Sequence, residues 1–266
     1  MIQARHLTKT GMTTTLETTA TKRAPMDKTR RTALVAGVFY LITFVSIPTL
    51  ALYGPVKNHR DWILSSGTHT GVLAGGLLEM IVALAGIGTA VTLYPVVKRQ
   101  NEGAALGFVA SRVVEGCMIF TGVISLLSLA TLRQGGAAGA NAASLVTTGA
   151  SHVAIYNGTF LLGQTLMPCI NALLLGSLMY RSRLVPRIIP VLGLIGAPLL
   201  ITAVIATLFG GSIGHVSAFA AIATLPVAAW EFSLGVWLVV KGFKPSPITA
   251  EMTAADTAPA YHDVTV

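Results

Sequence analysis

Six long apolar blocks dominate this sequence and decide the class of fold that it can adopt. Each block has the roughly 20 residues that a helix needs to cross the hydrocarbon core of a bilayer. Barrel strands would show ten-residue segments of alternating hydrophobicity instead. The sequence therefore predicts an all-α, polytopic transmembrane bundle of six helices, at Ala33–Tyr53, Thr70–Val97, Ala104–Leu132, Ala154–Tyr180, Ile188–Phe209 and Val216–Val240.

Composition and charge support a membrane protein and exclude a nucleic-acid-binding one. The chain is 53% hydrophobic and 11% charged, whereas soluble domains carry about 25% charged residues. The net charge is +8, but the basic residues cluster at the ends of the apolar blocks and form no basic face. Most of the 18 Lys and Arg residues fall on one side if both termini are cytoplasmic. We therefore expect an N-in/C-in, multi-pass protein of the plasma (inner) membrane.

Two polar tails flank the predicted bundle. Residues 1–32 are Thr-rich and basic and are expected to be a disordered cytoplasmic tail, as are residues 242–266. Residues 33–241 form the predicted transmembrane domain, whose first block is too long for a cleaved signal peptide. The sequence leaves open whether Met1, Met12 or Met26 is the start. The beginning of the fourth helix is the least defined boundary, because residues 134–151 are rich in Gly, Ala, Ser and Thr.

Four ionisable residues lie inside the apolar blocks: Arg112, Glu115, Glu231 and Glu79. A charge at membrane depth is costly, so each needs a partner, a proton or a water-filled cavity. Three carboxyl groups share one guanidinium here. At least one glutamate should therefore be protonated, water-exposed or bound to a cation.

Depth along the helices separates these four residues. Arg112 lies eight residues from the inner end of its block, or about 12 Å, and Glu231 lies ten residues before Lys241, or about 15 Å. Arg112 and Glu115 are three residues apart on one helix face, so the three form a candidate intramembrane charge cluster. Its role is either a structural ion pair or part of a functional site. Glu79 lies about 27 Å up its helix with no basic group expected at its level.

Glu79 is therefore the candidate proton or cation site, with an interfacial side chain as the plain alternative. The fourth block adds a polar stripe, Asn157, Gln164 and Asn171, at intervals of seven residues. Pro168 removes the usual donor to the Gln164 carbonyl. The stripe is expected either to line a pathway or to make hydrogen bonds between helices.

Other motifs give no catalytic or metal assignment. His59, His69, His152, His215 and Asp61 lie on the predicted outer side, but not at the short spacings typical of metal ligands. No nucleotide-binding, zinc-protease or nucleophile-elbow motif occurs in a plausible context. We therefore expect no catalytic residue, no metal, no cofactor and no enzymatic activity.

Three segments together resemble the DUF4386 family of uncharacterised bacterial integral membrane proteins. They are YRSRLVPRIIPVLGLIGAPLL (Tyr180–Leu200), WEFSLGVWLVVKGFKP (Trp230–Pro245) and FVASRVVEGC (Phe108–Cys117). The resemblance spans about residues 30–245 and implies a multi-helix membrane protein without a defined activity. It places Arg112, Glu115 and Glu231 in the family's pattern and assigns no catalytic residue.

The functional hypothesis is a small permease or exporter, proton-linked through Glu79 or Glu231. The alternative is a non-transporting structural or sensory protein that associates with other membrane proteins. The expected partners are the lipid bilayer, anionic lipid headgroups near Arg181, Arg183 and Arg187, and a second copy of the chain. The substrate, the coupling ion and the oligomeric state are left open.

Overall fold

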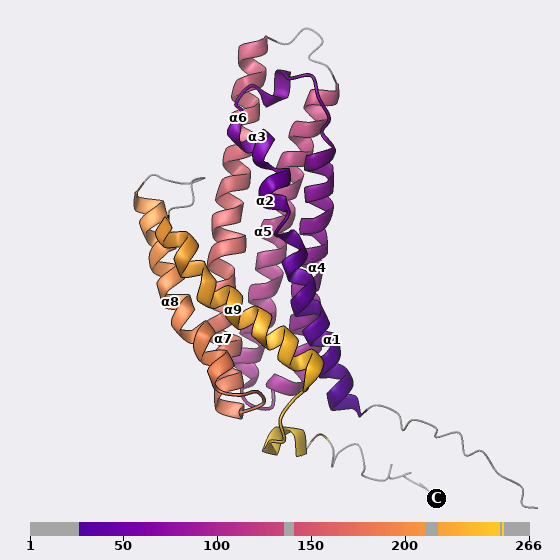
Figure 1. Ribbon diagram of the computed structural model, residues 1–266, viewed down its shortest axis with the longest axis vertical. Helices are drawn as coiled ribbons and strands as arrows, with labels where there is room; N and C mark the ends of the chain where they lie inside the picture. The colour runs from indigo at the N-terminus through magenta and orange to yellow at the C-terminus, as the bar shows by residue number, and fades with distance from the viewer. Residues whose placement is uncertain (1–26, 136–140, 211–217, 251, 253–266) are drawn as a thin grey trace, which may run out of the picture.

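The computed structural model describes residues 27–135, 141–210, 218–250 and 252. Six helices in this part of the chain are long and apolar enough to cross a membrane. They correspond to the six predicted blocks, so the predicted all-α fold with six membrane-length helices is confirmed. Both the start of the first helix and the end of the last lie at one end of the bundle (Figure 1). We call this the basal end and the opposite end the distal end. That the basal end faces the cytoplasm stays a prediction.

The first span is a chain of short segments rather than one helix. α1 (Lys28–Ile42) continues through η1 (Thr43–Ser46) and α2 (Thr49–Leu52), and the chain then turns through α3 (Gly54–Asn58) and η2 (Trp62–Leu64). The breaks fall near Pro48 and Pro55, where the missing backbone N–H prevents a regular helix from continuing. The distal segments therefore leave the line of α1 and continue toward the distal end beside α6, where we call the α3–η2 segment the cap (Figure 1).

The other spans are longer and more regular. α4 covers Thr70–Val97, α5 covers Glu102–Gln134, α8 covers Ile188–Phe209 and α9 covers Ala218–Val240. The fourth span is one continuous rod made of α6 (Ala142–Thr159), the π-helix η3 (Phe160–Leu166) and α7 (Met167–Ser182). This span begins at Ala142, twelve residues before the predicted Ala154, so the small polar residues of this stretch are helical.

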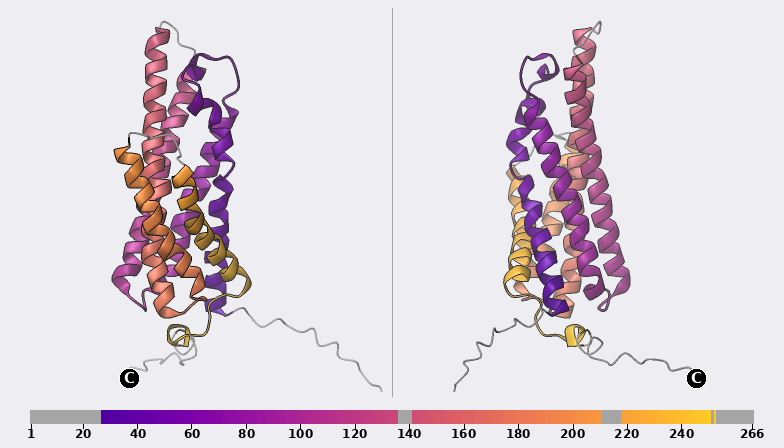
Figure 2. Two further views of the ribbon diagram at one scale, coloured as in Figure 1. Left: turned by 60° about the vertical axis from the view of Figure 1, so that its left-hand side comes forward. Right: turned by 90° about the vertical axis from the view of Figure 1, so that its right-hand side faces the viewer.

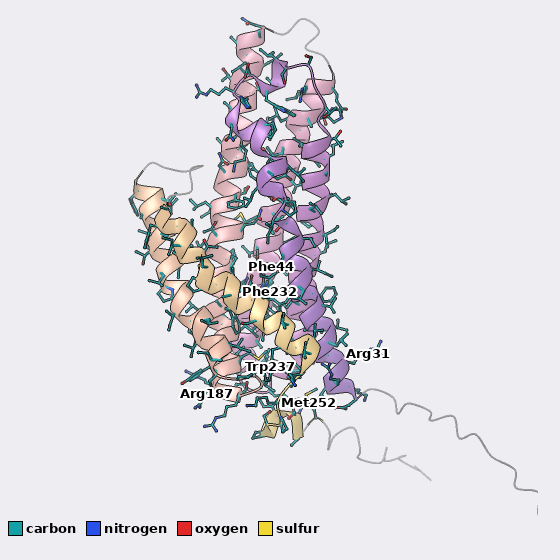
Figure 3. All side chains as sticks on the ribbon, viewed as in Figure 1. Arg31, Phe44, Arg187, Phe232, Trp237 and Met252 are labelled. Atoms are coloured by element: carbon teal, nitrogen blue, oxygen red, sulfur yellow. The ribbon has the colours of Figure 1, made fainter. Side chains whose placement is uncertain are left out.

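The basal half is a closed ring of helices. Each helix contacts the next in the order α1, α4, α5, α7, α8, α9 and back to α1. α9 runs obliquely across the face of the bundle (Figures 1 and 2). Where it crosses the first span, Phe44 and Phe232 pack edge to face with their ring centres 5.5 Å apart (Figure 3). The ring encloses the main apolar core, which includes the fully buried Trp230.

The distal half is narrower. α4, α5 and α6 extend past the distal ends of α8 and α9, and the α3–η2 cap lies against them (Figures 1 and 2). The 33 residues of α5 reach about 50 Å and the 22 residues of α8 about 33 Å. A separate apolar cluster around Tyr53, Trp62, Leu126 and Tyr156 holds the cap in place.

Both predicted tails are partly ordered. Residues 28–32 belong to α1, so the predicted disorder at this position is wrong. The Arg30 guanidinium donates to the carbonyls of Leu238 at 2.8 Å and Val239 at 2.6 Å, at the C-terminal end of α9. Beyond α9, the Lys244 amide donates to the Leu184 carbonyl at 2.7 Å and Ile248 is buried. Residues 1–26, 251 and 253–266 lie outside the described part of the chain, and so does the predicted disorder there.

Trp230 provides a test of the basal core. It is 1% exposed and lies against Gly193 of α8, so Trp230→Ala should lower the free energy of unfolding by about 3–5 kcal/mol. Thermal or SDS-induced unfolding in detergent measures the change. Phe209→Ala is the matched control because this ring is 89% exposed, and it should change stability little. Equal losses for both variants would contradict the described core.

Candidate functional site

The charge cluster lies where α5, α7 and α9 meet. Arg112 donates from Nη2 to Glu231 Oε1 at 2.7 Å and from Nη1 to Glu115 Oε2 at 3.0 Å. One guanidinium therefore joins a carboxylate of its own helix to a carboxylate of the last span. The predicted pairing of Arg112 with Glu231 and Glu115 is present in the structure.

Polar groups of α5 and α7 complete the cluster. Asn171 Nδ2 donates to Glu115 Oε2 at 2.7 Å. Ser111 Oγ in turn donates to the side-chain amide oxygen of Asn171. The Arg112 guanidinium also lies 5.4 Å from the centre of the Tyr40 ring, which adds a cation–π contact from α1. Asn171 thus holds the Glu115 carboxylate and Ser111 holds Asn171, whereas the buried Nε of Arg112 has no hydrogen-bond partner among the described residues. We call Arg112, Glu115, Glu231 and Asn171 the guanidinium cluster.

Glu79 is completely buried and has three neutral hydrogen-bond donors. Tyr156 Oη donates to Glu79 Oε1 at 2.8 Å, Gln164 Nε2 donates to the same oxygen at 3.1 Å, and Tyr53 Oη donates to Oε2 at 3.4 Å. We call these four residues the Glu79 centre. Glu79 therefore has hydrogen-bond partners that the sequence did not predict, and all three are neutral. The expectation of an interfacial side chain is wrong, because no part of Glu79 is exposed.

Two glycines make room for the tyrosines of the Glu79 centre. A Cβ atom at Gly75 of α4 would lie 2.4 Å from the Tyr53 ring. A Cβ at Gly122 of α5 would lie 3.2 Å from the Tyr156 ring and 2.7 Å from Thr159 Oγ1. The two rings also pack against each other edge to face, with centres 5.2 Å apart. Close helix packing at these glycines thus positions both phenol groups on one carboxyl.

The predicted polar stripe is displaced by one residue at its distal end. Gln164 contacts Glu79 and Asn171 contacts Glu115, but the side chain in line with them is Tyr156 rather than Asn157. The π-helix at Phe160–Leu166 explains the shift, because each wide turn takes up one extra residue. Asn157 instead lines a separate pocket beneath the cap.

Gln164 connects the two buried centres. Besides its bond to Glu79, it lines a cavity of about 180 Å³ together with Arg112, Glu115 and Glu231. Residues of η1, including Thr43 and Ser46, form another wall of this central cavity. The side chain of Glu231 is 14% exposed, compared with 9% for Glu115 and 2% for Arg112. Glu231 is therefore the most accessible of the three charged groups.

Lys57 lies on the distal side of the Glu79 centre. Its ammonium is 5.3 Å from the centre of the Tyr156 ring and 5.6 Å from that of Phe160. Partial burial lowers the pKa of the Lys57 ammonium, and the nearby Glu79 carboxylate partly opposes this shift. Sequence reasoning missed Lys57 because the short segments after Pro48 leave the line of α1 and pack beside α6. The tyrosines had one available signal, since a phenol deep in an apolar helix needs a hydrogen-bond partner.

The outer histidines do not converge. His152 contacts Ser125, His69 contacts Gln134 and His59 is exposed, whereas His215 lies outside the described residues. Within the described ranges, no group of three His, Cys, Asp or Glu side chains is placed to hold a metal ion. The three arginines that were expected to meet lipid headgroups lie at the basal end: Arg181 in the last turn of α7, and Arg183 and Arg187 in the loop before α8.

The fold and the buried charges define a multi-pass α-helical membrane protein. The chain belongs to the DUF4386 family, described as a domain of unknown function, whose model matches residues 35–242. The resemblance inferred from the sequence is thereby confirmed. Comparisons with curated proteins and with solved structures gave no match.

A double-mutant cycle tests the guanidinium cluster. Arg112→Met should lower the free energy of unfolding by about 3–5 kcal/mol because it leaves buried carboxylates unpaired. Glu231→Gln should cost less in the Arg112→Met background than alone, with a coupling of about 0.5–3 kcal/mol measured by unfolding in detergent. The control cycle pairs Arg112→Met with Glu102→Gln, an exposed carboxylate at the basal end, and should be additive. Zero coupling between Arg112 and Glu231 would show that their contact is not energetically significant.

A second prediction concerns the charge of Lys57. The midpoint of its pH-dependent acylation, measured by peptide mass spectrometry, should fall below the usual value for a lysine, since burial lowers its pKa. Glu79→Gln should lower the midpoint further because it removes the opposing carboxylate. The control, Glu102→Gln, replaces an exposed carboxylate at the basal end and should leave it unchanged. A Lys57 midpoint that is the same in the wild type and in Glu79→Gln would contradict the coupling.

Proposed function

We propose that this chain is a small proton-linked permease or exporter of the bacterial plasma membrane and not an enzyme. Glu79 is the residue that gains and loses the proton. One observation carries the proposal: a fully buried carboxyl whose three hydrogen-bond partners are neutral, joined through Gln164 to a cavity that holds charged groups.

The partners of Glu79 suit both protonation states. An ionised carboxylate accepts all three hydrogen bonds that its neighbours donate. A protonated carboxyl needs one acceptor, and a tyrosine hydroxyl or a glutamine amide oxygen can serve as one after rotation. No fixed cation is bonded to Glu79 in the described part of the chain, so neither state requires a strong ion pair to be broken.

The guanidinium cluster suits a different role. Arginine stays protonated in proteins, so Arg112 keeps Glu115 and Glu231 paired while Glu79 titrates. Glu231 faces the central cavity and is the second candidate for proton exchange. The cavity lies between the first span and α9, and relative movement of these two elements would change access to it.

Transport across liposomes tests the proposal. Purified protein should move protons, reported by an internal pH-sensitive dye, when small organic anions or cations are supplied on one side. Glu79→Gln should lower the rate about tenfold or more, equivalent to about 1.4 kcal/mol in the barrier. Gln164→Leu should also lower it because it removes the link to the cavity. Glu102→Gln is the matched control and should retain the wild-type rate.

The alternative is a non-transporting structural or sensory membrane protein. The contact between Arg112 and Glu231 favours this alternative, because a buried ion pair can have a purely structural role, here to hold α5 against α9. Proton movement no faster than in protein-free liposomes with every solute, and no effect of Glu79→Gln, would contradict the permease and favour this alternative.

A further inference from the structure

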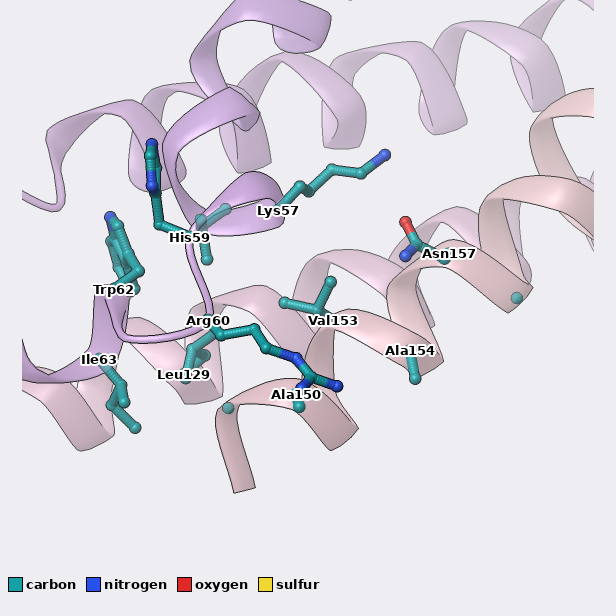
Figure 4. Close-up of a pocket in the computed structure, with 13 residues that line it drawn as sticks. Lys57, His59, Arg60, Trp62, Ile63, Leu129, Ala150, Val153, Ala154 and Asn157 are labelled. Atoms are coloured by element: carbon teal, nitrogen blue, oxygen red, sulfur yellow. The ribbon is translucent and has the colours of Figure 1, made fainter. Parts of the chain in front are cut away.

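A pocket of about 550 Å³ lies under the distal cap, between the α3–η2 segment and α6 (Figure 4). Its volume falls within the range of about 300–1,000 Å³ typical of sites for small molecules. It is separate from the central cavity, with which it shares no lining residue. The proposed function does not use this pocket.

The charged side chains of this distal pocket are both basic. Lys57 and Arg60 line it together with the imidazole of His59, and no Asp or Glu occurs among the described lining residues. Figure 4 shows the Arg60 side chain extending from the cap toward α6, while Lys57 leaves the same segment in the direction of Asn157. A carboxylate, sulfonate or phosphate beside the Arg60 guanidinium would gain charge-assisted hydrogen bonds, and Lys57 adds a second positive charge to the lining.

The remaining walls are largely apolar. Val56, Trp62 and Ile63 of the cap face Leu129 of α5. Trp62 is fixed in place because the Arg133 guanidinium lies 4.1 Å from the centre of its ring and also donates to the Ser65 carbonyl. Such walls suit a hydrocarbon or aromatic body better than an inorganic ion.

Small residues of α6 create the space. Gly149, Ala150, Ala154 and Gly158 line the pocket along one side of the helix. A Cβ atom at Gly158 would meet no other atom within 4 Å, so the space beside it is open. Asn157 lies between them, and its buried Oδ1 has no hydrogen-bond partner among the described residues. That oxygen can accept a hydrogen bond from a bound molecule.

We propose that the distal pocket binds a small organic anion with an apolar body. The acidic group binds at Arg60, within the positive field to which Lys57 contributes, and the body packs against Trp62 and the small residues of α6. A dissolved carboxylate and the headgroup of an anionic lipid share this chemistry, and competition with lipid separates them. The inference holds whether or not the protein transports protons, because it concerns equilibrium binding.

Quenching of Trp62 fluorescence tests the inference. Full-length protein in nanodiscs of neutral phosphatidylcholine is titrated with bromobenzoate and with bromooctanoate, whose bromine quenches an indole in contact with it. We expect saturable quenching that is absent in Trp62→Phe. Lys57→Met and Arg60→Gln should each raise the dissociation constant tenfold or more. The uncharged bromobenzamide should bind at least tenfold more weakly than bromobenzoate.

Two controls keep the result interpretable. Lys98→Met removes a lysine that lies 5.4 Å from a tyrosine ring at the basal end, and it should leave binding unchanged. Ala150→Leu fills the pocket without changing its charge and should abolish quenching. The test for anion binding therefore does not depend on whether the Lys57 and Arg60 variants fold. Phosphatidylglycerol added to the nanodiscs displaces the probe if the ligand is a lipid headgroup and leaves it bound if the ligand is a dissolved anion.

The inference is overturned if neither probe gives saturable quenching of Trp62. It is also overturned if Lys57→Met and Arg60→Gln both bind bromobenzoate as the wild type does, since the pocket would then be an apolar cavity without anion selectivity. Failure of proton transport in liposomes would leave these binding results unaffected.

Discussion

The cost of placing charge in a hydrocarbon interior governs this structure. A buried ion is tolerated only where partners replace the water that it loses. Arg112 meets this requirement by bonding to Glu115 on its own helix and to Glu231 on the last span. At the basal end, Arg30 bonds to the terminal carbonyls of α9 and so joins the first span to the last. Two arginines thereby contribute to closing the ring of helices.

The guanidinium cluster and the Glu79 centre meet the cost of buried charge in different ways. The guanidinium cluster combines fixed opposite charges and changes little unless helices move apart. The Glu79 centre has only neutral partners, two of which are hydroxyl groups that can reverse their hydrogen bonds. A proton can therefore bind or leave Glu79 with local rearrangement alone. Gln164 touches both regions, which makes it the residue through which a change at one would reach the other.

The sequence predicted the spans well because length and hydrophobicity alone decide whether a helix can cross a bilayer. It also predicted the contact of Arg112 with Glu231, since depth along two helices can be counted from their ends. It misplaced Asn157 because the π-helix adds a residue per turn, and no residue pattern marks that turn in advance. It missed the positions of Lys57 and Tyr53 because Pro48 breaks the first span, and the path of the chain after this proline depends on tertiary packing against α4 and α6.

The central claim is that Glu79 exchanges a proton inside the bundle. Infrared difference spectroscopy on the full-length protein in nanodiscs measures this directly, because a protonated carboxyl and a carboxylate absorb separately. We expect a protonated-carboxyl band that decreases as the pH is raised and is missing from the Glu79→Gln difference spectrum. A Glu79 band that stays constant over the accessible pH range, or no such band at any pH, would contradict the claim.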